Sequence, residues 1–158
     1  YDTIVTKTGA TGDALDELNE VADNIFGELP TDMATVGIAV GEVNTRFGQT
    51  GDILEETSKQ FIEFAEINGT DLNSSIDTVD RIIKQFGLDA SDAGNILGIM
   101  TKRGQETGIS VAGLMNAIDG KYRSVPGFRG ESHLIWVYSR YASGNCLYSV
   151  FYQEQARL

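Results

Sequence analysis

The chain has 158 residues, the length of about one domain. It carries 12 Lys and Arg against 23 Asp and Glu, a formal net charge of −11, with a single Cys and a single His. This acidity disfavours nucleic-acid binding, because neutralising phosphates requires clustered basic residues. One Cys and one His exclude an internal disulfide and Cys-rich or His-rich metal sites. No apolar run approaches the ~18 residues of a membrane span, so we expect none.

The first predicted helix follows Thr11-Gly12-Asp13. The Thr11 side chain can accept hydrogen bonds from the first free N–H groups, and Asp13 suits the positive end of a helix. Gly27 is typical of the left-handed residue that ends a helix. Apolar residues recur between these points at steps of three and four, which places them on one inward face: Leu15, Leu18, Ala22, Ile25 and Phe26.

A second helix is predicted after Pro30-Thr31-Asp32, from Met33 to Phe47, with Gly48 as its stop. Gly37 and Gly41 lie four residues apart inside it, and each weakens a helix by roughly 1 kcal/mol relative to Ala. Two interpretations stay open for this pair. The glycines allow another helix to approach closely, or they are simply tolerated small residues.

Four further helices follow in the pattern. They run from Thr50-Gly51-Asp52 to Gly69, from about Leu72 to Phe86, from about Ala90 to Gln105, and from after Ser110 to Gly120. Their apolar stripes are Ile53, Leu54, Phe61, Ile62 and Ala65; Ile76, Val79, Ile82, Ile83 and Phe86; Ala93, Ile96, Leu97 and Met100; and Val111, Leu114, Ala117 and Ile118. Connections of about two to six residues force neighbouring helices to pack antiparallel. We therefore predict an all-α bundle of about six short antiparallel helices.

Two short patterns recur along these helices. Phe-Gly ends three segments, at Phe26-Gly27, Phe47-Gly48 and Phe86-Gly87, and predicts a last core anchor followed by a helix stop. The segment starting at Thr11 resembles the one starting at Thr50, 39 residues later, and Thr107-Gly108 is a weaker third start. A 39-residue step fits a helix-pair unit. With one good pair of copies, repeated helix-start chemistry explains most of the similarity, and we do not expect a solenoid.

The composition changes near Gly120. Residues 1–119 hold 21 acids and seven bases, a net charge of −14, whereas residues 120–158 have a net charge of +3 and eight aromatic residues. We predict an acidic helical domain over 1–119 and a basic, aromatic-rich tail or hairpin over 120–158. Residues 132–141 and 146–152 are rich in β-prone types and flank a turn at Ser143-Gly144-Asn145. The aromatic residues are candidate partner contacts: Trp136, Tyr138, Tyr141, Phe151 and Tyr152.

Carboxylate pairs are the first candidates for chemistry, at Glu55/Glu56, Glu63/Glu66 and Asp77/Asp80. In a segment this acidic such pairs arise by composition, so we interpret them as solvated helix faces. The spacing of oxygen ligands from Asp71 to Asp77 is that of the start of a calcium loop, but the required glycine and final Glu are absent. Helix capping by Asp71, Asn73 or Ser74 explains these residues better.

No other motif predicts catalysis or a cofactor. Glycine-rich phosphate loops are absent. His133 and Cys146 are 13 residues apart with no acid between them, which favours a chance pair over the alternative of a nucleophile and its base. We expect no catalytic residues, no cofactor, no metal and no small-molecule substrate.

Taken in order, several segments of the first 118 residues resemble the N-terminal part of phage tail tape measure proteins. The segments are Thr11-Gly-Asp-Ala-Leu-Asp-Glu-Leu, Ile25-Phe-Gly-Glu-Leu-Pro-Thr-Asp, Glu42-Val-Asn-Thr-Arg-Phe-Gly-Gln-Thr-Gly-Asp-Ile-Leu, Phe61-Ile-Glu-Phe-Ala-Glu-Ile-Asn-Gly-Thr-Asp and Thr107-Gly-Ile-Ser-Val-Ala-Gly-Leu-Met. The resemblance covers about three quarters of the chain and does not extend to residues 120–158.

The resemblance implies a structural role. Tape measure proteins are long, mostly helical chains inside a tail tube whose length they set, and this segment carries no catalytic residues in the family. It implies protein partners, namely tail tube, tail chaperone or baseplate components or further copies, and a place in the virion tail or, during assembly, the host cytoplasm. As one helix the chain would span only ~240 Å, too short for a ruler. We therefore expect a fragment, a remnant or a derived protein.

Two other hypotheses belong to different classes. The first is a stand-alone binding or regulatory module of phage or prophage origin that uses residues 120–158 to hold its partner. The second is a hydrolase or nucleic-acid enzyme, which would need His133 or a carboxylate pair in a pocket.

Overall fold

The structure is a computed structural model that describes residues 2–123. Within these residues the chain forms seven α-helices, one 3-10 turn and no strand. The elements are α1 (Asp2–Thr8), α2 (Asp13–Glu28), α3 (Met33–Phe47), α4 (Gly51–Asn68), α5 (Leu72–Phe86), the 3-10 turn η1 (Ala90–Asp92), α6 (Ala93–Thr107) and α7 (Val111–Arg123). The predicted all-α fold is confirmed. The predicted C-terminal hairpin lies outside the described residues.

Helix α1 is the element that the sequence did not predict. Its seven residues include four consecutive β-branched types and are too few to show a helical period. The helix forms because it packs on α3, where the Ile4 side chain is fully buried.

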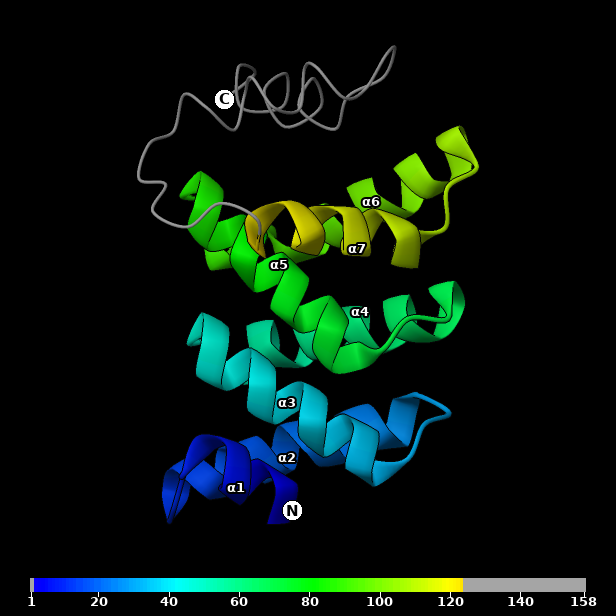
Figure 1. Ribbon diagram of the computed structural model, residues 1–158. Coiled ribbons are helices and arrows are strands. Elements are labelled where there is room, and N and C mark those ends of the chain that lie inside the picture. Colours follow the sequence, from blue (N-terminus) through cyan, green and yellow to red (C-terminus); the bar gives the residue numbers. More distant parts are fainter. Residues whose placement is uncertain (1, 124–158) are drawn as a thin grey trace. The chain divides into compact units, whose positions relative to one another are not determined.

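The helices of residues 2–118 form two layers (Figure 1). Helices α1, α3, α5 and α7 lie in the front layer of that view, and α2, α4 and α6 lie behind them. Helices α2 to α4 pack mainly on the next helix of the chain and on the next helix of their own layer, and α1 packs mainly on α3. In the front layer, the Ser75 hydroxyl and the Met115 sulfur, 4.0 Å apart, join α5 to α7. Consecutive helices run antiparallel because the chain turns back at two opposite edges.

Three stacked helix pairs repeat at a spacing of 39 residues, over 11–49, 50–88 and 89–123. Left-handed glycines precede the three pairs at this spacing: Gly9, Gly48 and Gly87. Side chains that accept a hydrogen bond from the first turn of α3, α5 and α7 have the same spacing: Asp32, Asp71 and Ser110. Stacked helix pairs in which each unit contacts its neighbours are the arrangement of helical solenoids.

This register corrects two expectations about repetition. The third unit begins at Asp89, not at Thr107-Gly108, because Gly108 ends α6. The similarity at Thr11 and Thr50 reflects a repeated unit rather than helix-start chemistry alone. Equivalent buried positions hold different residue types, so the repeat is hidden in the sequence: Leu18, Thr57 and Ile96; Ala22, Phe61 and Met100; Val36, Ser75 and Leu114.

Helix ends follow the sequence at most sites and depart from it at three. One is the predicted stop at Gly120, which α7 passes to end at Arg123. Helices α3 and α5 end at the left-handed Gly48 and Gly87, as predicted. Gly27 is not a stop, because α2 continues to Glu28 and ends at Leu29, which the following Pro30 holds in an extended conformation. Nor does the Thr11 side chain cap α2, whose N-cap position is occupied by Gly12 without a side-chain hydrogen bond.

Predicted inward residues are buried in most helices, but the Phe-Gly anchors differ from one another. Phe47 stacks on Phe61, with ring centroids 5.9 Å apart. Phe26 and Phe86 are 46% and 38% exposed, so neither is the core anchor that the pattern predicts. Ile53 and Ala117, also assigned to apolar stripes, are exposed as well.

Gly37 and Gly41 are sites of close helix approach, which decides between the two interpretations of this pair. A Cβ atom on Gly41 would lie 2.8 Å from the Lys7 Cβ, and one on Gly37 would lie 3.3 Å from the Thr3 Cβ. Helix α1 therefore rests directly on the α3 backbone at these two positions.

Candidate functional site

The first cluster of charged residues joins the three helices α1, α3 and α5. Arg46 is at its centre: its Nε donates to Glu42 Oε2 at 2.7 Å, and its NH1 group lies 2.9 Å from Asp77 Oδ1 and 3.6 Å from Asp80 Oδ2. Lys7 of α1 pairs with the other Glu42 oxygen. Lys7 and Arg46 are 39 residues apart, and each pairs with an acid on the next helix of its layer.

Asp80 is the most deeply buried acid of this cluster. Its side chain is 6% exposed, and its Oδ2 accepts a hydrogen bond from Lys84 Nζ at 2.7 Å. Its Oδ1 is buried without a hydrogen-bond partner. The predicted solvated face is therefore wrong for Asp77 and Asp80, because Arg46 of α3 reaches across to both.

The cluster favours the charged forms of Glu42 and Arg46. Burial acts to raise the pKa of Glu42, but hydrogen bonds from Lys7 and Arg46 outweigh it and lower that pKa below its usual value. Burial likewise acts to lower the pKa of Arg46, and hydrogen bonding to Glu42 with the attraction of Asp77 raises it overall. These groups hold the α1–α3–α5 layer together instead of exchanging protons near neutral pH.

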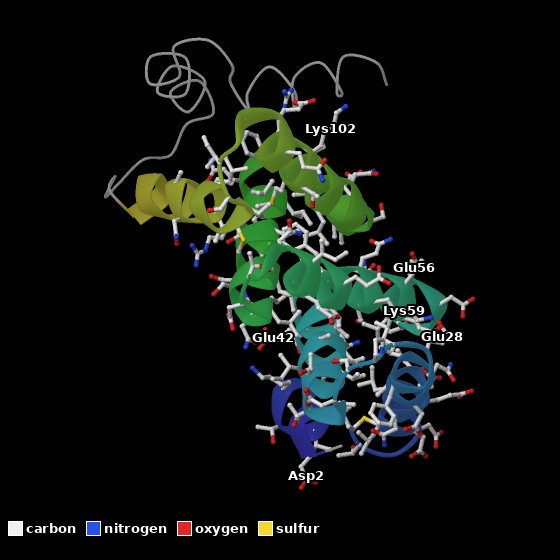
Figure 2. All side chains as sticks on the ribbon, turned by 90° about the vertical axis from the view of Figure 1, so that its right-hand side faces the viewer. Asp2, Glu28, Glu42, Glu56, Lys59 and Lys102 are labelled. Atoms are coloured by element: carbon white, nitrogen blue, oxygen red, sulfur yellow. The ribbon has the colours of Figure 1, made fainter. Side chains whose placement is uncertain are left out.

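A second charged cluster joins α2 to α4 (Figure 2). Lys59 Nζ lies 2.5 Å from Glu28 Oε2 and 2.7 Å from Glu55 Oε1, and the Asn24 amide donates to the other Glu55 oxygen at 3.0 Å. Hydrogen bonds to Glu28 and Glu55 raise the pKa of Lys59, and those from Lys59 and Asn24 lower the pKa of Glu55. In Figure 2 this cluster lies on the side of the array opposite Glu42.

The other predicted carboxylate pairs lie at the surface, as expected. Glu63 and Glu66 are exposed, and Glu56 is exposed with a hydrogen bond from the Gln60 amide. Glu55 differs from them because Lys59 and Asn24 bind it.

A shallow hollow of about 530 Å³ lies between the α2–α3 turn and the α4–α5 turn. It contains three carboxylates, from Asp32, Glu66 and Asp71. Asp32 and Asp71 already accept hydrogen bonds from the backbone N–H groups of Thr35 and Ser74. None of the residues that line the hollow is Lys, Arg, His or Cys.

The segment with calcium-loop spacing begins a helix. Asp71 caps α5, accepting from the Ser74 N–H at 2.8 Å, which confirms the capping interpretation. Among the described residues no three His, Cys, Asp or Glu side chains are grouped as metal ligands. None of the helices of residues 2–123 is both long and apolar enough to cross a membrane.

The predicted partner contacts Trp136, Tyr138, Tyr141, Phe151 and Tyr152 lie outside the described residues, as do His133 and Cys146. Helices α1 to α6 and α7 as far as Asp119 belong to one compact unit, Tyr1–Asp119, and Gly120 begins a second.

Sequence reasoning missed the cluster around Arg46. Its local part was visible, since Glu42–Arg46, Asp77–Arg81 and Asp80–Lys84 all have the i,i+4 spacing of helical ion pairs. The contacts from Arg46 to α5 have no local pattern and follow from the 39-residue stacking.

Comparisons of the chain with protein-family models, with curated proteins and with solved structures find no match.

Proposed function

We propose that the chain is a helical structural segment of a phage tail tape measure protein, acting through protein–protein contacts in tail assembly and length determination. The observation that carries the proposal is the ordered series of motifs from Thr11 to Met115. The stacked helix pairs support it, because such arrays present long surfaces to other proteins. Its partners are tail tube, tail chaperone or baseplate components or further copies, in the tail or, during assembly, in the host cytoplasm.

The proposed role is not enzymatic. In both charged clusters Lys, Arg or Asn side chains bind the carboxylates, which supports a role in holding helices together. The hollow beside Asp32 and Asp71 contains acids that cap helices, and its lining residues include no basic side chain.

Mass spectrometry of purified tails tests this function. Particles from the source culture are separated into tails and soluble lysate, and each fraction is digested. We expect peptides of residues 1–118 in the tails. Recovery of these peptides from the soluble fraction alone would reject the structural role.

The second candidate function is a stand-alone binding module of phage or prophage origin. The change from a net charge of −14 to +3 at residue 120 favours it, because the aromatic and basic residues gather in the second part. Cross-linking identifies the bound protein, and Trp136→Ala with Tyr152→Ala then tests the contact. This candidate predicts loss of the cross-linked complex with helicity unchanged, whereas an undiminished complex rejects it.

A further inference from the structure

Within the described residues, the face of α2 that points away from α4 lacks the neighbour that α4 and α6 both have. Each of those helices packs on the preceding helix of its layer, α4 on α2 and α6 on α4. Helix α1 packs mainly on α3 in the other layer. The position before α2 in the rear layer is therefore not filled by any element of residues 2–118.

The 39-residue register shows which residues this face contains. On α4, Glu55 accepts a hydrogen bond from Asn24 of α2 at 3.0 Å. On α6, the equivalent Gly94 lies against the Gln60 side chain of α4, since a Cβ there would be 2.2 Å from Gln60 Oε1. The equivalent residue of α2 is Asp16, which is exposed.

Neighbouring positions in the 39-residue register are also less covered on α2 than on α4 and α6. Leu54 and Ala93 are 0% and 1% exposed on α4 and α6, whereas the equivalent Leu15 is half-buried. Ala65 lines the hollow against the α2–α3 turn, whereas the equivalent Phe26 is 46% exposed. We call Leu15, Asp16 and Phe26 the open face of α2.

We propose that the open face of α2 docks an amphipathic, basic helix of a partner protein, parallel to α2. Continuity with the α2–α4 and α4–α6 contacts defines the occupant as a helix. Charge defines its chemistry, because α2 contains six acids and no Lys or Arg. Glu28 pairs with Lys59 of α4, but Asp16 and Glu20 are exposed. A second copy docking through the same face would bring Asp16 and Glu20 of both copies together, which opposes such a dimer.

The probe is a fluorescent peptide built on residues 11–29. It keeps Asn24, which contacts α4, and the buried Val21 and Ile25, and it carries Lys in place of the exposed acids. Anisotropy measures its binding to the full chain. We expect Phe26→Asp and Asp16→Lys each to weaken binding about tenfold, the loss of one central contact. Ile53→Asp and Asp52→Lys are the matched controls on the exposed side of α4, and we expect changes within about twofold.

Equal losses in the test and control variants would overturn the proposal, because general attraction to an acidic protein would then explain binding. No binding of the peptide at millimolar concentration would also overturn it. A dimer of the full chain that Phe26→Asp dissociates in sedimentation velocity would assign the face to a second copy. A shift in Trp136 emission on Phe26→Asp without peptide would assign it to the chain's own C-terminal segment. The proposal does not depend on the tail function.

Discussion

Replacing Gly41 with Ala tests the contact between α1 and α3. The new methyl group would lie 2.8 Å from Lys7 Cβ and 3.2 Å from Lys7 Cγ, closer than such atoms pack. Overpacking of this kind costs about 1–3 kcal/mol, and Ala in place of a helical Gly returns roughly 1 kcal/mol. The cost cannot exceed that of detaching α1 from α3, because detachment removes the clash. Detachment exposes the fully buried Ile4, whose burial contributes about 1.5–3 kcal/mol. We expect Gly41→Ala to destabilise the protein by roughly 1 kcal/mol.

The matched control is Gly98→Ala on α6. No atom lies within 4 Å of a Cβ at Gly98, so the substitution should stabilise the helix by up to about 1 kcal/mol. Urea unfolding followed by circular dichroism at 222 nm measures both variants. Hydrogen exchange of the Gly9 amide, which donates to Val5 at 2.8 Å, reports on α1 alone. If Gly41→Ala stabilised the protein as much as Gly98→Ala, with Gly9 exchange unchanged, the close α1–α3 contact would be refuted.

Three further predictions concern the ion pairs and caps. Arg46→Gln leaves the buried Asp80 without its cation from α3 and should lower the free energy of unfolding in urea by about 1–3 kcal/mol. The control Lys102→Gln, at an exposed site, should lower it by less than ~0.5 kcal/mol. Equal effects would contradict the assigned cluster. Asp71→Ala should lower the free energy of unfolding by about 1 kcal/mol because it removes the α5 cap, whereas Asp71→Asn should keep most of the cap's stabilisation. Thermal unfolding distinguishes the two variants, and equal melting temperatures would argue against capping. The pKa of Glu42 is lower in the folded state than its ordinary 4.5, so its contribution to stability is present above pH 4.5 and is lost as the pH falls further. Below pH 4.5 the urea midpoint should therefore drop more steeply in the parent protein than in Glu42→Gln. Parallel curves of midpoint against pH would refute the linkage.

Local patterns predicted the helices well where a cap, an apolar period and a stop coincide. Asp32, Met33 to Phe47 and Gly48 are such a case, because each feature acts within one or two turns of the chain. The predicted stop at Gly27 was wrong because Pro30, three residues later, fixes the end of α2. Phe26 and Phe86 were wrongly predicted to anchor the core, because an apolar residue with helical spacing is buried only if another helix covers that side.

Contacts between distant residues were the hardest to predict. The function of Gly41 depends on α1, which is too short to predict and forms through its contact with α3. The burial of Asp80 depends on Arg46, 34 positions earlier in the chain, and on the stacking of one helix pair on the next. The candidate partner residues such as Trp136 stay predictions, because they lie outside the described residues.

The stacking of helix pairs determines how residues 2–118 would respond to a pulling force. The principal contacts of each helix reach the next helix or the one after it, so the array has no strong link between its two ends. A load along the chain would open the pairs one at a time, starting where α1 or α7 has the fewest neighbours. Each pair of 39 residues would release up to about 130 Å of extended chain. Mechanically, the three pairs are links in series, each of which can lengthen while the others remain folded.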